Sequence, residues 1–294
     1  MKDLISIKDL STKEIEGIFS LTDKLKANKL KFAKALSGQT IALIFQKPSN
    51  RTRVSFEVGM FQLGGNSIYL SPGEINLGVR ETIHDVAKTL SRYVQGIVLR
   101  TFGHENVLEM AKHADIPVIN GLSDFSHPCQ GLADIYTAKE KLKTLKGKTL
   151  TYLGDGNNVC NSLIFICSKV GMNINVATPK GYEPQAKGAT LKLFNNPIDA
   201  AKDADVLYTD VWASMGQEKE AQERKKIFKD FQINSNLLKL AKKDCLVMHC
   251  LPAHRGEEIT SDVIDSKNSV VFDEAENRMH VQKAVLIKLL GEVK

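Results

Sequence analysis

Short apolar runs alternate with helical patterns along most of this chain, and this alternation constrains its fold more than any other feature. The runs Thr40–Phe45, Gly96–Leu99 and Thr149–Leu153 have the length of buried strands, and a stretch with apolar residues at helical spacing follows each of them. Strands that alternate with helices form parallel sheets that are covered on both faces. The sequence therefore predicts an α/β protein.

The alternation occurs twice, which indicates two domains. A segment rich in Lys and Ala, from about residue 130 to 145, interrupts the pattern as a connecting helix, and the pattern then starts again at Thr149. With 294 residues and 43% hydrophobic composition, the chain is long enough for two cores. We predict two doubly wound domains, residues 1–135 and 136–275, each with a mostly parallel sheet flanked by helices. A final helix, residues 276–294, is expected to pack back on the first domain.

The remaining expected elements follow from local patterns. A capping-box sequence at Ser11 to Glu14 predicts an opening helix with its apolar face at Ile15, Ile18, Phe19, Thr22 and Leu25. Two further helices are expected over Ile83 to Tyr93 and Asn106 to Ala114. Further strands are expected at Ser67–Leu70, Ile116–Ile119, Ile174–Ala177, Val206–Thr209, Cys245–Met248 and Ser269–Phe272.

Composition excludes several classes of protein. The net charge is +6 without a basic block, so a nucleic-acid partner is not expected, and mild basicity suits small anionic substrates. No apolar run approaches the roughly 20 residues of a membrane span, and the N-terminus lacks a signal-peptide pattern, so we expect a cytoplasmic protein without a membrane partner. Five cysteines without a C-x-x-C pair predict neither a disulfide framework nor a zinc site.

The loop after the first strand is rich in hydrogen-bond donors. Ser49 or Asn50 can cap the next helix, whose N-terminal N–H groups would then point at a ligand. Ser49 and Thr52 add hydroxyls, Arg51 and Arg53 add guanidinium groups, and the loop contains no acidic residue. This composition favours a phosphate site. The alternative is an ordinary capped helix with two solvated arginines.

The other polar clusters also follow predicted strands, where ligands bind in parallel α/β sheets. Arg100 ends one strand, and His127 and Gln130 lie one helical turn apart after another. Asp210 precedes a loop that ends in Ser214, Met215 and Gly216, which we interpret either as a flap over an amine site or as a solvated loop. Cys250 is either a nucleophile beside His249 or a polar contact. Adjacent strand residues point to opposite faces, so the neighbouring histidine is weak support for a nucleophile.

A Gly154-Asp155-Gly156 segment after a strand suggests a dinucleotide site, but the pattern is incomplete. Val159 occupies the third glycine position, and no acidic residue follows the next predicted strand. An NAD-dependent oxidoreductase is therefore a disfavoured alternative. Asn157 and Asn158 can instead bind a polar substrate, or simply form the turn from strand to helix.

Four of these motifs resemble those of the aspartate/ornithine carbamoyltransferase family, in the family's order and over essentially the whole chain. Residues 49 to 53, Ser-Asn-Arg-Thr-Arg, resemble the family's S-T-R-T-R, and residues 127 to 130 match its H-P-x-Q. Residues 210 to 216 and the His-Cys-Leu-Pro sequence at 249 to 252 resemble the ornithine branch, because the aspartate branch has proline in place of the cysteine.

The resemblance implies direct transfer of a carbamoyl group from carbamoyl phosphate to the side-chain amine of L-ornithine, without a covalent enzyme intermediate. The catalytic residues it implies are Arg51, Arg100, His127 and Cys250. Carbamoyl phosphate would bind Ser49, Asn50, Arg51, Thr52, Arg100, His127, Gln130, Cys250, Leu251 and Arg278. Ornithine would bind Asn158, Asp210, Ser214 and Met215. It also implies a homotrimer with active sites between subunits, and no metal or organic cofactor.

Two residues depart from the family pattern. Asn50 replaces the usual Thr, and an asparagine serves equally well if the position supplies a backbone N–H and a helix cap. Asn76 stands where the family usually has Gln in a loop that reaches a neighbouring subunit's site, and its side chain is shorter. We also expect a division of labour in which Arg51 faces the ligand and Arg53 braces the loop or a subunit contact.

Other readings stay open on the sequence alone. One is a carbamoyltransferase for another amine: aspartate, putrescine or an acylated ornithine. Another is a phosphometabolite-binding protein without catalysis.

Overall fold

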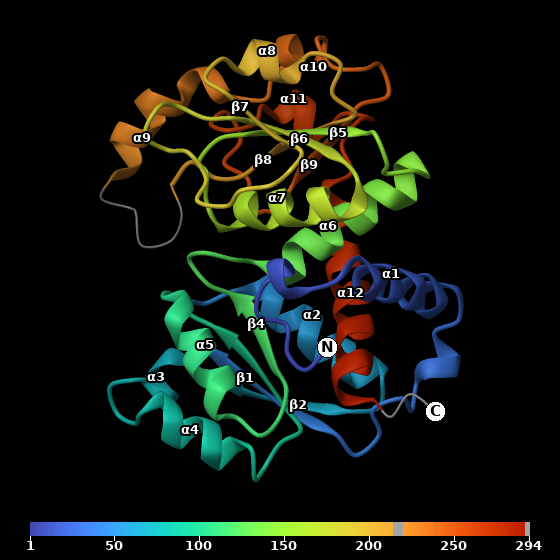
Figure 1. Cartoon of the computed structure of the whole chain (residues 1–294), viewed down its shortest axis with the longest axis vertical. Coiled ribbons are helices and arrows are strands. Elements are labelled where there is room, and N and C mark those ends of the chain that lie inside the picture. Colours follow the sequence, from blue (N-terminus) through green and yellow to red (C-terminus); the bar gives the residue numbers. More distant parts are fainter. Residues whose placement is uncertain (214–219, 292–294) are drawn as a thin grey trace. The chain divides into compact units, whose positions relative to one another are not determined.

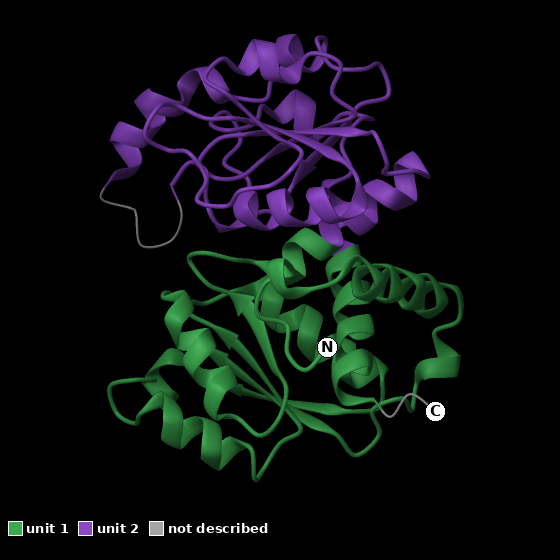
Figure 2. Ribbon diagram, in the orientation of Figure 1, with its two compact units in different colours: residues 1–132, 277–294 green, residues 133–276 purple. Residues whose placement is uncertain are grey.

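A computed structural model describes residues 1–213 and 220–291, and it divides into two compact units. Unit 1 contains residues 1–132 and 277–294, and unit 2 contains residues 133–276 (Figure 2). The division falls within two helices, α6 (Pro128–Leu142) and α12 (Val271–Leu290), so each of these helices belongs partly to both units.

Unit 1 is built on a four-stranded parallel sheet in the order β2-β1-β3-β4 (Figure 1). Its strands are β1 (Thr40–Phe45), β2 (Asn66–Leu70), β3 (Gly96–Arg100) and β4 (Val118–Leu122). Its other elements are η1 (Ile7–Asp9), α1 (Thr12–Ala27), η2 (Leu30–Phe32), α2 (Asn50–Gln62), α3 (Pro72–Ile75), α4 (Ile83–Leu90) and α5 (His104–His113).

Helices cover both faces of the unit 1 sheet. On one face, alternate strand residues such as Ala42 and Ile97 pack with Val86 of α4 and Met110 of α5. The other side carries α1, α2 and the unit 1 part of α12 (Figure 1). Strands buried on both faces read as continuous apolar runs, which is why β1 was recognisable in the sequence.

The opening helix confirms the sequence prediction in detail. Ser11 caps α1 and forms a capping box with Glu14, and the five residues expected on the apolar face are all buried. Tyr93 was expected on the face of α4, but α4 ends at Leu90 and Tyr93 is 72% exposed, so that part of the prediction is wrong.

Unit 2 repeats the architecture with a five-stranded parallel sheet in the order β7-β6-β5-β8-β9. Its strands are β5 (Thr149–Leu153), β6 (Asn173–Ala177), β7 (Leu191–Phe194), β8 (Val206–Thr209) and β9 (Leu246–His249). Its other elements are α7 (Asn158–Val170), α8 (Pro197–Ala201), α9 (Ala221–Phe228), η4 (Lys229–Phe231), α10 (Ser235–Leu238) and α11 (Ser261–Ile264).

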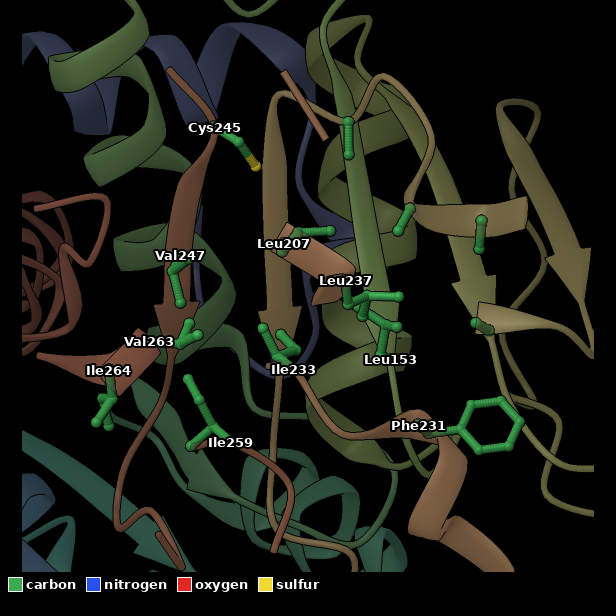
Figure 3. Close-up of a cluster of buried hydrophobic side chains, with 14 of the residues drawn as sticks. Leu153, Leu207, Phe231, Ile233, Leu237, Cys245, Val247, Ile259, Val263 and Ile264 are labelled. Atoms are coloured by element: carbon green, nitrogen blue, oxygen red, sulfur yellow. The ribbon is translucent and has the colours of Figure 1, made fainter. Parts of the chain in front are cut away.

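A cluster of buried aliphatic side chains fills one side of the unit 2 sheet (Figure 3). Leu153, Leu207 and Val247 come from three neighbouring strands, and Leu237 of α10 and Val263 of α11 pack against them. This core fixes the positions of β5, β8 and β9, whose carboxyl ends carry polar residues singled out in the sequence.

The predicted fold class is confirmed, because both units have parallel sheets flanked by helices. The predicted strand Ser269–Phe272 is wrong: Ser269 makes one isolated bridge to Val247, and α12 begins at Val271. A short apolar run does not distinguish a strand from a buried helix start. The edge strand β7, half of it exposed, was missed.

Among residues 1–213 and 220–291, no helix is both long and apolar enough to span a bilayer.

Candidate active site

The donor-rich loop of unit 1 joins the end of β1 to the N-terminus of α2. Ser49 is the N-cap, and its hydroxyl accepts a hydrogen bond from the Thr52 N–H at 3.2 Å. Asn50 is the first residue of α2, and no acidic residue lies in the first turn. The positive end of the helix dipole is thus free of a carboxylate within its own first turn, which suits an anion.

Thr52 is the centre of a buried polar cluster. Its hydroxyl lies 3.5 Å from Nη1 of Arg100, at the end of β3, and 3.4 Å from Nη2 of Arg278, on α12. Arg278 also donates to the side-chain oxygen of Gln130 on α6. All four side chains are at most 5% exposed. The tertiary structure therefore gathers residues from four elements of unit 1 into one hydrogen-bonded cluster.

His127, which precedes α6, lies in the same positive field. Burial and the charges of Arg278, Arg100 and Arg51 hold its pKa well below the ordinary value. All three of these charges are positive, so His127 is neutral near pH 7 and serves as an uncharged hydrogen-bonding group. Three guanidinium groups near one buried imidazole form an electrostatic arrangement that an anion would stabilise.

Lys47 supports this loop and was missed in the sequence. It is 6% exposed, its Nζ lies 2.7 Å from Asp124 Oδ1, and the ammonium sits 4.1 Å from the centre of the Phe102 ring. Lys47 thus links the β1–α2 loop to the segment after β4. In the sequence, Lys47 is visible as a lysine in the loop that follows an apolar strand. No motif or spacing in the sequence links Lys47 to Asp124.

Arg51 and Arg53 have different surroundings. Arg51 is half-buried and contributes to the positive field at His127. Arg53 is exposed, its Nε is 2.9 Å from Glu57 Oε1, and its guanidinium lies 3.8 Å from the centre of the Tyr69 ring. The structure therefore places Arg53 in contacts that brace α2 against β2.

Asn76 ends the short helix α3 in the left-handed conformation, with φ of 40° and ψ of 51°. Asparagine is one of the few residues that adopt this conformation at low cost. The side chain is exposed. Its contact with a neighbouring subunit stays a prediction.

In unit 2, Asp210 connects the ends of two strands. Its Oδ2 accepts a hydrogen bond from Asn157 at 2.7 Å, and its Oδ1 lies 3.0 Å from the Cys250 thiol and accepts from the Val211 N–H at 2.8 Å. Asp210 is 6% exposed. A fixed carboxylate at this edge is suited to a positively charged amine.

Asn157 and Asn158 divide their roles. Asn157 caps α7 by accepting from the N–H groups of Val159 and Cys160, at 3.0 and 3.1 Å, and it also donates to Asp210. Asn158 is the first residue of α7 and is half-buried. The sequence prediction named Asn158 for the substrate, and Asn157 is the residue that positions Asp210.

The second glycine of the Gly-Asp-Gly segment has a packing role. A Cβ at Gly156 would lie 2.3 Å from the Pro184 backbone nitrogen. Close backbone approach therefore accounts for this glycine without a dinucleotide.

The Cys250 thiol is held in its neutral form. Burial and the neighbouring Asp210 carboxylate raise its pKa well above the ordinary value. Because the thiolate is the nucleophilic form, this environment opposes nucleophilic catalysis and favours a polar contact.

The loop after β9 is fixed by a histidine whose two ring nitrogens are both engaged. His249 Nδ1 accepts from the Leu251 N–H at 2.9 Å, so Nε2 carries the hydrogen that it donates to Glu258, 3.0 Å away. Leu251 has a φ of 58° and precedes a cis proline. Asp210, His249 and Cys250 are close enough to share a metal, but both histidine nitrogens already serve the fold.

Arg224 of α9 supports the same region. Its Nη1 lies 2.9 Å from Asp155 and 3.0 Å from the carbonyl oxygen of Trp212. Arg224 lies in a segment rich in charged residues, yet its side chain is 7% exposed. Ser214, Met215 and Gly216 lie outside the described residues.

Comparison with known proteins identifies the family of both halves of the chain. Residues 2–140 match the carbamoyl-P binding domain of aspartate/ornithine carbamoyltransferases, and residues 146–289 match the Asp/Orn binding domain of the same proteins. The chain belongs to the aspartate/ornithine carbamoyltransferase family.

Several relatives that match over almost their whole length carry the name ornithine carbamoyltransferase. The ornithine carbamoyltransferases of Thermococcus kodakarensis and Pyrococcus horikoshii are 53% and 55% identical to the chain. The alignments cover 100% of this chain and 98% and 97% of those proteins. The solved structure of ornithine carbamoyltransferase from Pyrococcus furiosus has a TM-score of 0.95 at 52% identity, over 100% of this chain and 98% of that one.

Proposed function

We propose that this enzyme transfers the carbamoyl group of carbamoyl phosphate to the side-chain amine of L-ornithine and forms L-citrulline and phosphate. The observation that carries the proposal is the cluster in which Arg100 and Arg278 converge on Thr52 at the N-terminus of α2. Buried guanidinium groups and helix N–H groups together fit a small phosphorylated substrate. Relatives of this length and identity that carry the name ornithine carbamoyltransferase support the acceptor.

We assign carbamoyl phosphate to unit 1. The N–H groups of α2, with Ser49, Asn50, Arg51 and Thr52, bind its phosphate. Arg100, His127, Gln130 and Arg278 hold the carbamoyl end. In the transition state the carbonyl oxygen gains negative charge, which Arg100 and neutral His127 stabilise by hydrogen bonds. Arg51 and the helix N-terminus stabilise the departing phosphate.

We assign ornithine to unit 2, where Asp210 and Cys250 bind its α-amino group and Asn158 contributes. Ser214 and Met215 remain part of this assignment, and Leu251 contacts the first substrate beside Cys250. The raised pKa of the thiol supports a contact role for Cys250. Attack by the side-chain amine on the carbamoyl carbon then expels phosphate directly, without a covalent enzyme intermediate.

The attacking amine must first lose a proton. A lysine-like amine has a pKa of about 10.4, so deprotonation near neutrality costs roughly 4 to 5 kcal/mol. We propose that ornithine binds with a neutral side-chain amine and that the leaving phosphate accepts the proton released on attack. The value of kcat/KM for ornithine should then rise with pH on the alkaline side. A flat or falling profile would contradict this mechanism.

The acceptor is tested by measuring citrulline or the corresponding carbamoylated product with carbamoyl phosphate and four amines in parallel. These are ornithine, aspartate, putrescine and N-acetylornithine. Ornithine should give the highest kcat/KM, by orders of magnitude over aspartate. If the enzyme prefers another amine, the assignment of ornithine as the acceptor is wrong, while the assigned carbamoyl phosphate site still stands. No turnover with any of them, despite carbamoyl phosphate binding, would favour a binding protein.

We further propose that the protein is a cytoplasmic homotrimer. All five cysteines are free, which supports a reducing compartment. Support for self-association comes from α2 and the edge strand β2, where Val54, Phe61 and Ile68 are 53%, 80% and 50% exposed. Val54 and Phe61 are seven residues apart and therefore share a face of α2. Apolar exposure of this kind marks protein interfaces.

A further inference from the structure

A buried group of acids in unit 2 has no role in the chemistry described above. Asp134 of α6, Tyr208 of β8 and Glu274 of α12 are each 0% exposed. The Tyr208 hydroxyl lies 3.1 Å from Asp134 Oδ2 and 3.2 Å from Glu274 Oε1. The Tyr208 hydroxyl therefore contacts one oxygen of each carboxyl group.

This geometry fixes the number of protons. The Tyr208 hydroxyl has one hydrogen for two carboxyl oxygens, so hydrogen bonds along both contacts require one proton on one of the carboxyl groups. The Asp134–Glu274 pair therefore carries one proton and one negative charge. Burial, followed by the neighbouring Asp134, raises the pKa of Glu274 well above its ordinary value of 4.5.

Glu274 also links two strand ends. Its Oε2 accepts a hydrogen bond from the His249 backbone N–H at 3.0 Å, while its Oε1 contacts Tyr208. Tyr208 is two residues before Asp210, and His249 is one residue before Cys250. One buried side chain thus joins the two backbone segments that carry the Asp210–Cys250 pair.

Further ionisable groups face this cluster, and the Asp210 carboxylate among them disfavours a second negative charge. Asp210, after β8, and Cys250, after β9, both lie close enough to affect the pKa of Tyr208. Cys167 of α7 is affected by Asp134 in the same way. An additional charge on the pair would therefore meet both burial and like charge.

We propose that the Asp134–Glu274 pair, with its single shared proton, positions the ends of β8 and β9 and thereby sets the affinity for ornithine. Glu274 and Tyr208 are positioning residues, because both are fully buried and act through the ends of β8 and β9. This inference rests on the proposed roles of Asp210 and Cys250. If the shared proton is lost, the link to Tyr208 and His249 weakens while the carbamoyl phosphate residues of unit 1 keep their own contacts.

The test compares the KM values of the two substrates in three variants. Glu274→Ala leaves the His249 N–H without its acceptor, which should raise the KM for ornithine about ten- to a hundredfold. The KM for carbamoyl phosphate should change less than about threefold on the same scale. Glu274→Gln keeps an acceptor for the His249 N–H and a hydrogen-bonding group beside the Tyr208 hydroxyl, and it should restore the ornithine KM. Asp273→Asn, which removes the exposed pair with Lys141 on the same helix, is the matched control and should change neither value.

A stability measurement checks the proton itself. The folded-state pKa of Glu274 is raised, so unfolding releases the shared proton above pH 4.5. Wild-type stability should therefore decline as pH rises from 4.5 towards the folded-state pKa, with the slope of one proton. Glu274→Gln has no such proton and should lack that component of the slope. If the free energy of unfolding has the same dependence on pH in the wild type and in Glu274→Gln, the pair does not share a proton.

Equal increases in the two KM values for Glu274→Ala, or an unchanged ornithine KM, would overturn the positioning role. If the alanine variant does not fold, Tyr208→Phe tests the same link, since it deletes one hydroxyl and should raise the ornithine KM alone. Asp210→Asn separates this inference from the function on which it rests. An unchanged ornithine KM in Asp210→Asn contradicts the assigned site. A raised KM there, with no effect in Glu274→Ala or Tyr208→Phe, contradicts the positioning role alone.

Discussion

At the scale of single residues, neighbours in the sequence have different chemistry because their side chains point in different directions. Arg51 contributes to the positive field at His127, while Arg53 contacts Glu57 and Tyr69. His249 is fully buried and bonded to Glu258, whereas Cys250 faces Asp210. In each pair, one residue is proposed to contact the substrate, and its neighbour makes contacts that anchor the same segment of the chain.

Arg51→Ala should abolish detectable binding of carbamoyl phosphate. The variant loses a charge-assisted contact to the phosphate, worth about 1.5 to 3 kcal/mol for each hydrogen bond. Isothermal titration with carbamoyl phosphate measures this directly. Arg53→Ala is the matched control and should keep an affinity within about threefold of the wild type, since an exposed ion pair contributes about 0 to 1 kcal/mol. An unchanged affinity in Arg51→Ala would rule out the assigned phosphate site.

Cys250→Ala should raise the KM for ornithine more than it lowers kcat. The thiol is neutral and donates to Asp210, so its removal weakens a contact to the substrate without removing a nucleophile. A lost hydrogen bond of this type corresponds to about 1 kcal/mol, or roughly a fivefold change in KM. Steady-state kinetics with saturating carbamoyl phosphate give both constants. Complete loss of turnover at saturating ornithine would show that the thiol takes part in the chemical step.

At the scale of elements, helix N-termini determine where polar groups lie. Ser11, Ser49 and Asn157 each cap a helix with a side-chain oxygen, but only the helices that follow β1 and β5 begin at the edge of a sheet. Those two caps therefore position groups of the candidate site. The cap of α1 contributes to stability alone, and it can be tested without affecting the active site.

Glu14→Gln should lower the free energy of unfolding by about 1 kcal/mol at pH 7, in the range of other capping substitutions. Hydrogen bonds from the Ser11 backbone and side chain lower the pKa of Glu14 to about 2. The contribution of the Glu14 carboxylate to the free energy of unfolding is fully present above pH 4.5, the ordinary pKa of a glutamate. It is lost as the pH falls through the folded-state pKa of about 2. Urea unfolding at pH 7 and pH 2.5 measures the difference. Glu16→Gln, on the exposed face of the same helix, should show little change, and an equal effect in both variants would contradict the capping role.

At the scale of the whole molecule, two units have the same architecture, and each is proposed to bind one of the two substrates. Each unit supplies its polar groups from strand ends and from a helix that follows a strand, as open parallel sheets generally do. The exposed apolar residues on α2 and β2 belong to unit 1, so the proposed self-association involves the carbamoyl phosphate unit.

Phe61→Glu should convert the proposed trimer into monomers at micromolar concentration. Phe61 is 80% exposed on the face of α2 that also carries Val54, and a buried carboxylate in a subunit interface would lack a partner. Light scattering coupled to size-exclusion chromatography measures the mass. Leu30→Glu changes an equally exposed apolar residue, 88% exposed, on η2 and should leave the mass unaltered. A wild-type protein that is monomeric would contradict the proposal.

The sequence by itself determined the fold class and the identity of several groups. The buried strands β1, β5 and β8 were recognisable because parallel strands covered on both faces are continuous apolar runs. The loop at Ser49 to Arg53 was recognisable because donors, a cap and the start of a helix are adjacent in the chain. Such features are local, so periodicity and composition are sufficient to predict them.

Only the tertiary structure decided which distant side chains meet. Thr52 contacts Arg278, which is 226 positions away, and Glu274 contacts His249 and Tyr208. The end of β9 was predicted, but its link to α12 was not, and the start of α12 was mistaken for a strand. The physical reason is that a pairing between distant side chains depends on how strands are ordered in a sheet and which helices cover it. That order is set by the packing of the whole core, and no local pattern in the sequence encodes it.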